Sequence, residues 1–299
     1  MYDIIIIGAG CAGLTAAVYA ARAGKSVLVL EAENIGGQIS YSPKVENFPS
    51  IRQISGSEFA DNLFEQASAL GVQLELERVT HIENGGTKKV HTEDSVHECR
   101  CVIIATGVKH RHLGVDREED FPGKGLSSCP ICDGAFYKGK KVAVPGGGNS
   151  ALQSAAMLAG TCEKVYLIHR RDTFRGEQAK ADELKKLENV EFVLNSIITD
   201  LAGDDVLTGV TVCSSQQGEC RNIALDGLSV SVGHMPENSV FEGLVQLDES
   251  GYIIAGEDCK TTAEGIFAAG DCRTKQVRQL TTAAADGSVA ALAAVDFIG

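Results

Sequence analysis

The sequence predicts an α/β protein with two domains of the same class, and two observations support this prediction. First, Asp3–Ile7 and Lys141–Val144 are short apolar runs, typical of buried parallel strands, and each precedes a glycine turn and an alanine-rich helix. Second, each helix leads to another apolar run, Ser26–Leu30 or Lys164–Ile168. Two such βαβ units, 138 residues apart in a chain of 299, predict two Rossmann-like domains.

The other expected elements follow from hydrophobic periodicity and from glycine-rich turns. The first helix is expected to end near Ala23 and the second to cover 150–159. Polar stretches near 108–118 and 235–245 are candidate hinges between the domains. The remaining elements are a helix at 59–70, strands at 72–76, 79–82, 89–92, 102–107 and 265–271, and a final helix at about 281–294.

Composition excludes several classes of partner. The net charge of −13 disfavours binding to nucleic acid or to an anionic membrane surface. The uncharged stretch 4–21 holds three glycines between Asp3 and Arg22, so we interpret it as strand, turn and helix rather than as a membrane span. No basic leader precedes it, which makes the cytoplasm the expected location. Most of the ten cysteines are then expected to be free thiols, packed as small apolar residues.

The first glycine turn has the pattern of a dinucleotide-binding loop. Gly8, Gly10 and Gly13 stand in the spacing GxGxxG, which permits a tight turn, close approach of a pyrophosphate and close packing of helix on strand. Phosphates at such a turn lie at the helix N-terminus, where free N–H groups and the helix dipole attract anions. Glu31 ends the second strand, at the position of an acid that binds the ribose hydroxyls of an adenosine.

The second turn, Gly146-x-Gly148-x-x-Ala151, differs from the first in the charge that follows its second strand. In place of Glu31 it has a basic run, made of His169, Arg170, Arg171 and Arg175. A carboxylate would repel a 2′-phosphate, whereas guanidinium groups bind one through charge-assisted hydrogen bonds. The run therefore predicts NADPH rather than NADH at this site, and the alternative is a solvated charged turn.

Cys129 and Cys132 form a CxxC pair between the two glycine turns. Such a pair can close a small disulfide and reopen it by taking up two electrons. Zinc would need two more ligands, and the nearest candidates, Cys99 and Cys101, are more typical of core packing, so no metal site is predicted. Inert buried thiols are a third interpretation, and a redox disulfide is the favoured one. Asp133 is either its acid–base group or a local capping residue.

Taken together, these motifs resemble those of the low-molecular-weight thioredoxin reductases, a family of flavoproteins, nearly from end to end. The matching segments are Gly8-Ala-Gly-Cys-Ala-Gly13, Gly36-Gly37-Gln38, Val45-Glu-Asn47-Phe-Pro, Ala105-Thr-Gly107, Cys129–Asp133-Gly134, Gly146-Gly-Gly148-Asn149-Ser150, His169-Arg-Arg-Asp-Thr-Phe-Arg175, Gly233-His234-x-Pro236, Gly265-Ile-Phe-Ala-Ala-Gly-Asp271 and Arg278-Gln279-Leu-Thr-Thr-Ala.

The resemblance implies FAD at the first site, NADPH at the second, and a homodimer with thioredoxin as electron acceptor. It implies two Rossmann-like domains of three-layer ββα type, with the NADPH domain (113–240) inserted into the FAD domain (1–112 and 241–299). Besides the three glycines of the first turn, the residues implied to hold FAD are Glu31, Gly37, Gln38, Asn47, Gly107, Asp271, Arg278 and Gln279. Those implied to hold NADPH are Gly146, Gly148, Asn149, Ser150, His169, Arg170, Arg171 and Arg175.

The resemblance also implies an order of electron transfer. In the family, NADPH passes a hydride to the flavin, and the reduced flavin reduces the disulfide through its second cysteine, here Cys132. Cys129 becomes the thiolate that attacks the partner disulfide, with Asp133 as the acid–base group. The dithiol must meet both the flavin and the partner, and family members rotate the middle domain about two hinges to allow this.

The sequence departs from the family pattern at a few positions. Pro130-Ile131 replaces small residues between the cysteines, Gln153 and Ser154 stand where relatives carry glutamates, and Pro145 removes a ladder donor from its strand. The alternatives are a reductase with a ferredoxin-like donor or another small disulfide protein as partner, such as a glutaredoxin-like one, and a non-catalytic redox sensor. The basic run at 169–175 favours NADPH, and the CxxC-Asp between two intact fingerprints disfavours the sensor.

Overall fold

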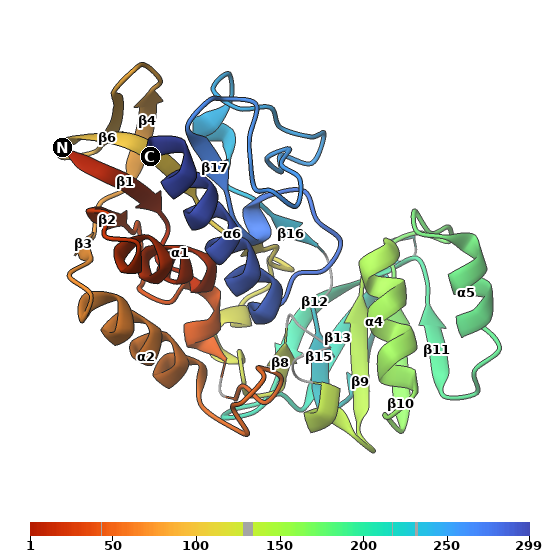
Figure 1. Cartoon of the computed structure of the whole chain (residues 1–299). Helices are drawn as coiled ribbons and strands as arrows, with labels where there is room; N and C mark the ends of the chain where they lie inside the picture. Colours follow the sequence, from red (N-terminus) through yellow and green to blue (C-terminus); the bar gives the residue numbers. More distant parts are fainter. Residues whose placement is uncertain (43, 128–133, 217, 231–232) are drawn as a thin grey trace. The chain divides into compact units, whose positions relative to one another are not determined.

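The chain folds into two compact units in the computed structural model. The structure describes residues 1–42, 44–127, 134–216, 218–230 and 233–299. Unit 1 comprises residues 1–109 and 235–299, and unit 2 comprises residues 110–234 (Figure 1). The chain passes between them within two short strands that pair with each other, β7 (Lys109–His110) and β16 (His234–Met235).

Unit 1 is built on a seven-stranded sheet of order β3-β2-β1-β6-β5-β4, with β17 added beside β6. β5 and β4 form an antiparallel extension, and the other strands are parallel. The apolar run Ile4–Ile7 lies between β2 and β6 and is buried, as expected for a central parallel strand. The strands are β1 (Tyr2–Ile7), β2 (Val27–Leu30), β3 (Gln73–Glu75), β4 (Val79–Glu83), β5 (Lys88–Thr92), β6 (Val96–Ile104) and β17 (Ile266–Ala268).

Three helices pack on one face of this sheet: α1 (Cys11–Arg22), α2 (Gly56–Ser68) and α6 (Leu280–Ile298) (Figure 1). α2 begins where the Ser55 hydroxyl accepts a hydrogen bond from the Glu58 N–H. By length and composition, α6 is a candidate membrane span among the described residues. Because its alanines pack against α1 and the sheet, and Asp286 in its middle is ion-paired, we interpret α6 as a core helix.

The buried cysteines of the chain behave as apolar core residues. Among the described residues six are free thiols, namely Cys11, Cys99, Cys101, Cys162, Cys259 and Cys272. Burial raises the pKa of the Cys99 thiol to about 12 and that of Cys101 to about 11, and the two lie in different apolar clusters. The expectation of free, packed thiols is confirmed for these six. Cys213 and Cys220 are not among them, because they form a disulfide.

Unit 2 has three layers, in which a parallel sheet lies between helices and an antiparallel sheet. The parallel sheet has the order β11-β10-β9-β15-β8, and the antiparallel sheet has the order β12-β13-β14. One apolar cluster joins the two sheets, and a second joins the parallel sheet to the helices α4 (Asn149–Ala159) and α5 (Gln178–Leu184). The strands are β8 (Leu126–Ser127), β9 (Lys141–Pro145), β10 (Lys164–Ile168), β11 (Val190–Val193), β12 (Ser196–Ala202), β13 (Gly209–Ser214), β14 (Cys220–Ala224) and β15 (Gly227–Ser229).

Pro145 ends β9 without disrupting it. It is paired with Ile168 of β10, and the next N–H, that of Gly146, donates to the Ile168 carbonyl at 2.9 Å. Because successive N–H groups alternate between the two sides of a strand, the donor that Pro145 lacks would face β15. The pairing of β15 with β9 ends two residues before Pro145, at Leu228 and Ala143. The proline therefore costs the sheet no ladder hydrogen bond.

Candidate nucleotide-binding sites

The first glycine turn of unit 1 lies at the carboxyl end of β1, where the strand order reverses and dinucleotides bind in this class of fold. Gly10 is the N-cap of α1, and no described side chain caps that helix end, so its first N–H groups are free for an anion. A methyl group on Gly13 would lie 1.8 Å from the Gly8 carbonyl oxygen. This position therefore admits only glycine, and the turn can keep its close packing.

Glu31 lies directly beside this turn. Its Oε2 accepts a hydrogen bond of 2.7 Å from the Ala9 N–H, and its Oε1 accepts one of 2.8 Å from the Glu33 N–H. The carboxylate thus holds the two βα connections together and keeps further lone pairs for hydroxyl donors. Gly37 and the exposed Gln38 follow in the 3₁₀ turn η1 (Gly37–Tyr41).

The remaining predicted residues of this site gather on the segments around η5 (Gly270–Cys272) and the start of α6. The Asn47 amide donates to the Gln279 side-chain oxygen at 3.2 Å, although the two are far apart in sequence. The Arg278 guanidinium donates to the carbonyl oxygens of Asp271, Arg273 and Lys275 and stacks on Tyr252, 4.2 Å from the ring centre. Gly107, in the turn after β6, adjoins η5, because its backbone forms a hydrogen bond with the Cys272 thiol.

Asp271 has a buried oxygen that calls for a ligand. Its Oδ1 has no hydrogen-bond partner among the described residues, and such an unsatisfied buried acceptor is costly. Burial raises the pKa of this carboxyl to about 6, and the Lys275 and Arg278 charges offset only part of that effect. A ligand with hydroxyl donors would satisfy this oxygen. The residues present therefore fit a dinucleotide with a hydroxyl-bearing chain: Asp271 would accept from its hydroxyl groups, and the α1 turn would hold its pyrophosphate.

Asp271→Asn should change how the stability of the flavin-free protein depends on pH. A carboxyl whose pKa is raised on folding favours the folded state below its unfolded pKa, near 3.8, and loses that contribution as pH rises through about 6. At 1.36 kcal/mol per pKa unit, the wild type should lose up to about 3 kcal/mol relative to the asparagine variant over this range. Urea unfolding of both proteins at pH 4 to 7 measures the difference. A constant difference would contradict the assignment.

The second glycine turn, in unit 2, repeats this arrangement at the end of β9. Gly148 is the N-cap of α4, again without a described side-chain cap, and Ser150 is exposed in the first turn of the helix. The loop after β10 folds back onto this turn, because the Arg175 N–H donates to the Gly147 carbonyl at 2.8 Å. The Asn149 side-chain oxygen also accepts from the Glu177 N–H, at 2.8 Å.

His169 is buried within this loop and supports it. A methyl group on Gly147 would lie 2.2 Å from the imidazole, which stacks on Phe174 and forms a 3.0 Å hydrogen bond with the Thr173 carbonyl. Burial lowers the pKa of the imidazole, so at neutral pH it contributes no positive charge.

Arg170, Arg171 and Arg175 are exposed on the same loop. Their guanidinium groups form no ion pair with any carboxylate of the described residues. Unpaired guanidinium groups beside a free helix N-terminus form a site for phosphate groups.

The redox pair lies outside the described residues, as does its acid–base candidate: Cys129, Cys132 and Asp133. Among the described residues, sequence reasoning missed the buried ion-pair network around Asp286 and the Cys213–Cys220 disulfide. An acid in the middle of an alanine-rich helix is a signal that points to the first. The seven-residue spacing of the two cysteines around a polar turn points to the second.

Comparison with known proteins places the chain in a family. The chain belongs to the pyridine nucleotide-disulphide oxidoreductases, whose family model matches residues 2–287. It is therefore an oxidoreductase of a class that uses a flavin and a pyridine nucleotide, which confirms the recognised family and the two Rossmann-like domains.

Its relatives define the class further. The chain is 39% identical to a thioredoxin reductase of Listeria monocytogenes, over 97% of this chain and 92% of the relative. It is 40% identical to a 34.2 kDa protein in a rubredoxin operon of Clostridium pasteurianum, over 99% and 97%. The crystal structure of thioredoxin reductase from Streptococcus pyogenes matches with a TM-score of 0.96 at 38% identity, over 100% and 98% of the two chains.

Proposed function

We propose that this protein is an NADPH-dependent, FAD-containing thioredoxin reductase that acts as a cytoplasmic homodimer. Unit 1 would hold FAD, which relays two electrons between the nicotinamide and the Cys129–Cys132 disulfide. Cys132 would accept these electrons, and Cys129 would attack the disulfide of thioredoxin. Asp133 would act as the acid–base group that donates and accepts the proton. The net charge of −13 supports a small protein rather than a nucleic acid as partner.

One observation carries the choice of NADPH. The loop after the second strand of the βαβ unit holds Glu31 in unit 1. In unit 2 it holds three exposed arginines that pair with no carboxylate of the described residues. A glutamate accepts hydrogen bonds from free ribose hydroxyls, whereas guanidinium groups need an anion, and the 2′-phosphate of NADPH supplies one at this position. The buried, neutral His169 would position the loop that carries these arginines through its contacts with Thr173 and Phe174.

The experiment that tests this function is anaerobic reduction of the bound flavin. NADPH should bleach the flavin absorbance much faster than NADH, and oxidised thioredoxin should then restore it. Absence of bleaching by NADPH would overturn the proposal and favour another electron donor, such as a ferredoxin. Bleaching without reoxidation by thioredoxin would instead identify another small disulfide protein as the partner.

Replacing Arg170 and Arg171 together with alanine should raise the KM for NADPH about 100-fold or more and leave the KM for NADH unchanged. Each charge-assisted hydrogen bond to the 2′-phosphate contributes about 1.5–3 kcal/mol, and 1.4 kcal/mol is a factor of ten. Steady-state kinetics with both nucleotides measure the effect. Arg221→Ala is the matched control, because Arg221 is an exposed arginine of the same unit that is already paired with Glu191. Equal effects on the two nucleotides would contradict the role of the pair.

A further inference from the structure

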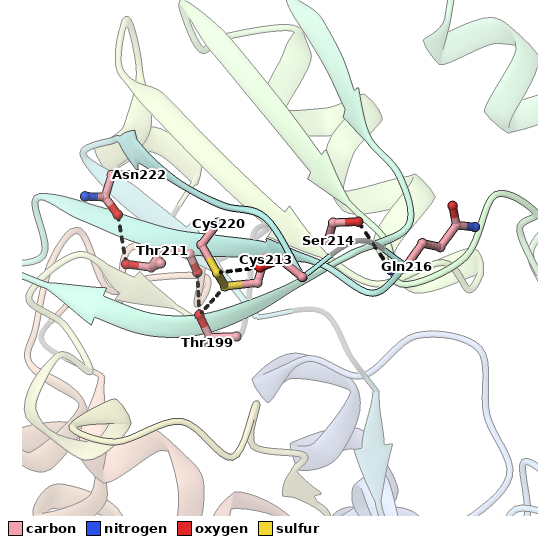
Figure 2. The surroundings of a disulfide bond; sticks show 8 residues. Thr199, Thr211, Cys213, Ser214, Gln216, Cys220 and Asn222 are labelled. Carbon is pink, nitrogen blue, oxygen red and sulfur yellow. Dashed lines mark hydrogen bonds between the residues drawn. A yellow bond between two sulfur atoms is a disulfide. The ribbon is translucent and has the colours of Figure 1, made fainter.

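Unit 2 carries a second cysteine pair, separate from the CxxC motif. Cys213 lies one residue before the end of β13, and Cys220 is the first residue of β14. The two are paired directly across the antiparallel strands, with their Cα atoms 4.0 Å apart. Figure 2 shows the disulfide beside Thr199, whose hydroxyl lies 3.3 Å from the Cys213 sulfur. Thr199 is the extra residue where the pairing of β12 with β13 shifts register.

This pair is the accessible one among the described cysteines. Cys220 is exposed and Cys213 half-buried, whereas the six free thiols are all buried, and burial raises the pKa of each. Thiol–disulfide exchange requires that a thiolate reach a sulfur atom along the line of the bond, so access decides which disulfides react. The Cys213–Cys220 bond is therefore open to attack by a dithiol from solution.

The turn that follows Cys213 contacts the loop after β10, which carries Arg170, Arg171 and Arg175 and is called the arginine loop below. The Ser215 hydroxyl lies 3.2 Å from the Arg170 carbonyl oxygen and 2.9 Å from that of Asn195, and the Ser215 N–H donates to the latter at 2.7 Å. The backbone carbonyl oxygens of the neighbouring residues in this loop also accept hydrogen bonds. The Ser196 N–H donates to His169 at 3.0 Å, and the Asn195 N–H donates to Arg171 at 3.3 Å.

We propose that Cys213–Cys220 is a second redox-active site, a disulfide that exchanges with a small dithiol protein and thereby sets the affinity of the adjacent arginine loop for a 2′-phosphate. The closed disulfide fixes the end of the hairpin and, through Ser215, the backbone of Arg170. When the bond opens, the hairpin end loses its cross-link and the arginine loop gains conformational freedom. Part of the binding free energy must then be used to order the arginines, so the affinity for the 2′-phosphate falls.

The electrons for opening the disulfide come from reduced thioredoxin, the product of the proposed function, and the inference rests on that function. A thiolate of reduced thioredoxin attacks one sulfur of the pair and forms a mixed disulfide, and its second thiol then releases the enzyme. Two electrons and two protons move to Cys213 and Cys220, and thioredoxin leaves as a disulfide. The reverse reaction with oxidised thioredoxin closes the bond, so that accumulating substrate would favour the form that binds NADPH more tightly.

The test uses the full-length FAD-loaded protein with Cys129→Ser and Cys132→Ser, so that only the second pair responds to reductant. Mass spectrometry of the peptide that spans both cysteines should show the bond closed after incubation with oxidised thioredoxin and open after reduced thioredoxin. The Kd for 2′,5′-ADP, measured by calorimetry, should rise about three- to tenfold on opening. Adding Cys213→Ser and Cys220→Ser should hold the Kd at the open value under both conditions. Ser215→Ala, which retains the disulfide, should lose most of the response.

A Kd that is the same in both states, or a pair that stays reduced with oxidised thioredoxin, would overturn the inference. If 2′,5′-ADP binds in neither state, the choice of NADPH fails instead, and amide hydrogen exchange decides the inference. Opening the disulfide should speed exchange at Asn195, Ser196 and Ser215, whose N–H groups form the contacts described above. Unchanged exchange at these amides would contradict the coupling.

Discussion

Cys132→Ser should abolish thioredoxin reduction, with a loss of at least about a thousandfold in kcat, while NADPH still bleaches the flavin. Under the proposed function, this cysteine is the sole entry point for electrons from the flavin into the disulfide. Its removal blocks the relay after flavin reduction and leaves both nucleotide sites intact. Stopped-flow absorbance measures the bleaching, and the formation of thioredoxin thiols measures turnover.

A matched control for this substitution is Cys162→Ala. Cys162 is a buried free thiol of the same unit, and burial raises its pKa, so it takes no part in exchange. The control should retain the wild-type rate of thioredoxin reduction. If Cys132→Ser keeps a tenth or more of that rate, or if the control loses as much as Cys132→Ser, electrons do not pass through Cys132.

Asp286→Ala should lower the free energy of unfolding by about 3–5 kcal/mol, because it removes the buried carboxylate that neutralises two buried positive charges. The Asp286 carboxylate accepts hydrogen bonds of 2.8 Å from both Arg273 and Lys275, and all three side chains are at least nine-tenths buried. It also accepts from the Gly270 N–H at 3.0 Å, directly before Asp271. The variant should therefore also retain FAD less tightly, which gel filtration followed by flavin absorbance measures.

The pH dependence of this loss has a definite sign. Burial acts to raise the pKa of Asp286, but the hydrogen bonds from Arg273 and Lys275 outweigh it and hold that pKa below its usual value. The contribution of Asp286 is thus present above the unfolded pKa, near 3.8, and is lost as pH falls through the folded pKa. Asp296→Ala, at an exposed position of the same helix, should change stability by less than about 0.5 kcal/mol. Equal losses in both variants would remove the special role of the network.

The sequence predicts the two βαβ units well because their signals are local. An apolar run, a glycine turn and an alanine-rich helix each act within a few residues, and the structure confirms all three in both units. The sheet β12-β13-β14 was not predicted, because the apolar positions of its strands face a cluster contributed by distant segments. The pairing of Cys213 with Cys220 depends on the register of that hairpin and was missed with it.

The site shows the same division between local and long-range information. The charge difference between Glu31 and the arginines at 170–175 is readable in the sequence, because both follow a predicted strand. The burial of His169 is not, since it depends on Gly147, which packs against it from another segment. Asp271 belongs to a motif, but its unsatisfied oxygen and raised pKa follow from burial that only the folded unit shows.

The most direct test of the proposed electron relay is its stoichiometry under anaerobic conditions. With limiting NADPH and excess oxidised thioredoxin, the wild-type protein should form two thioredoxin thiols for each NADPH consumed, and NADH should support little turnover. Consumption of NADPH without thioredoxin thiols, or equal turnover with NADH, would contradict the account.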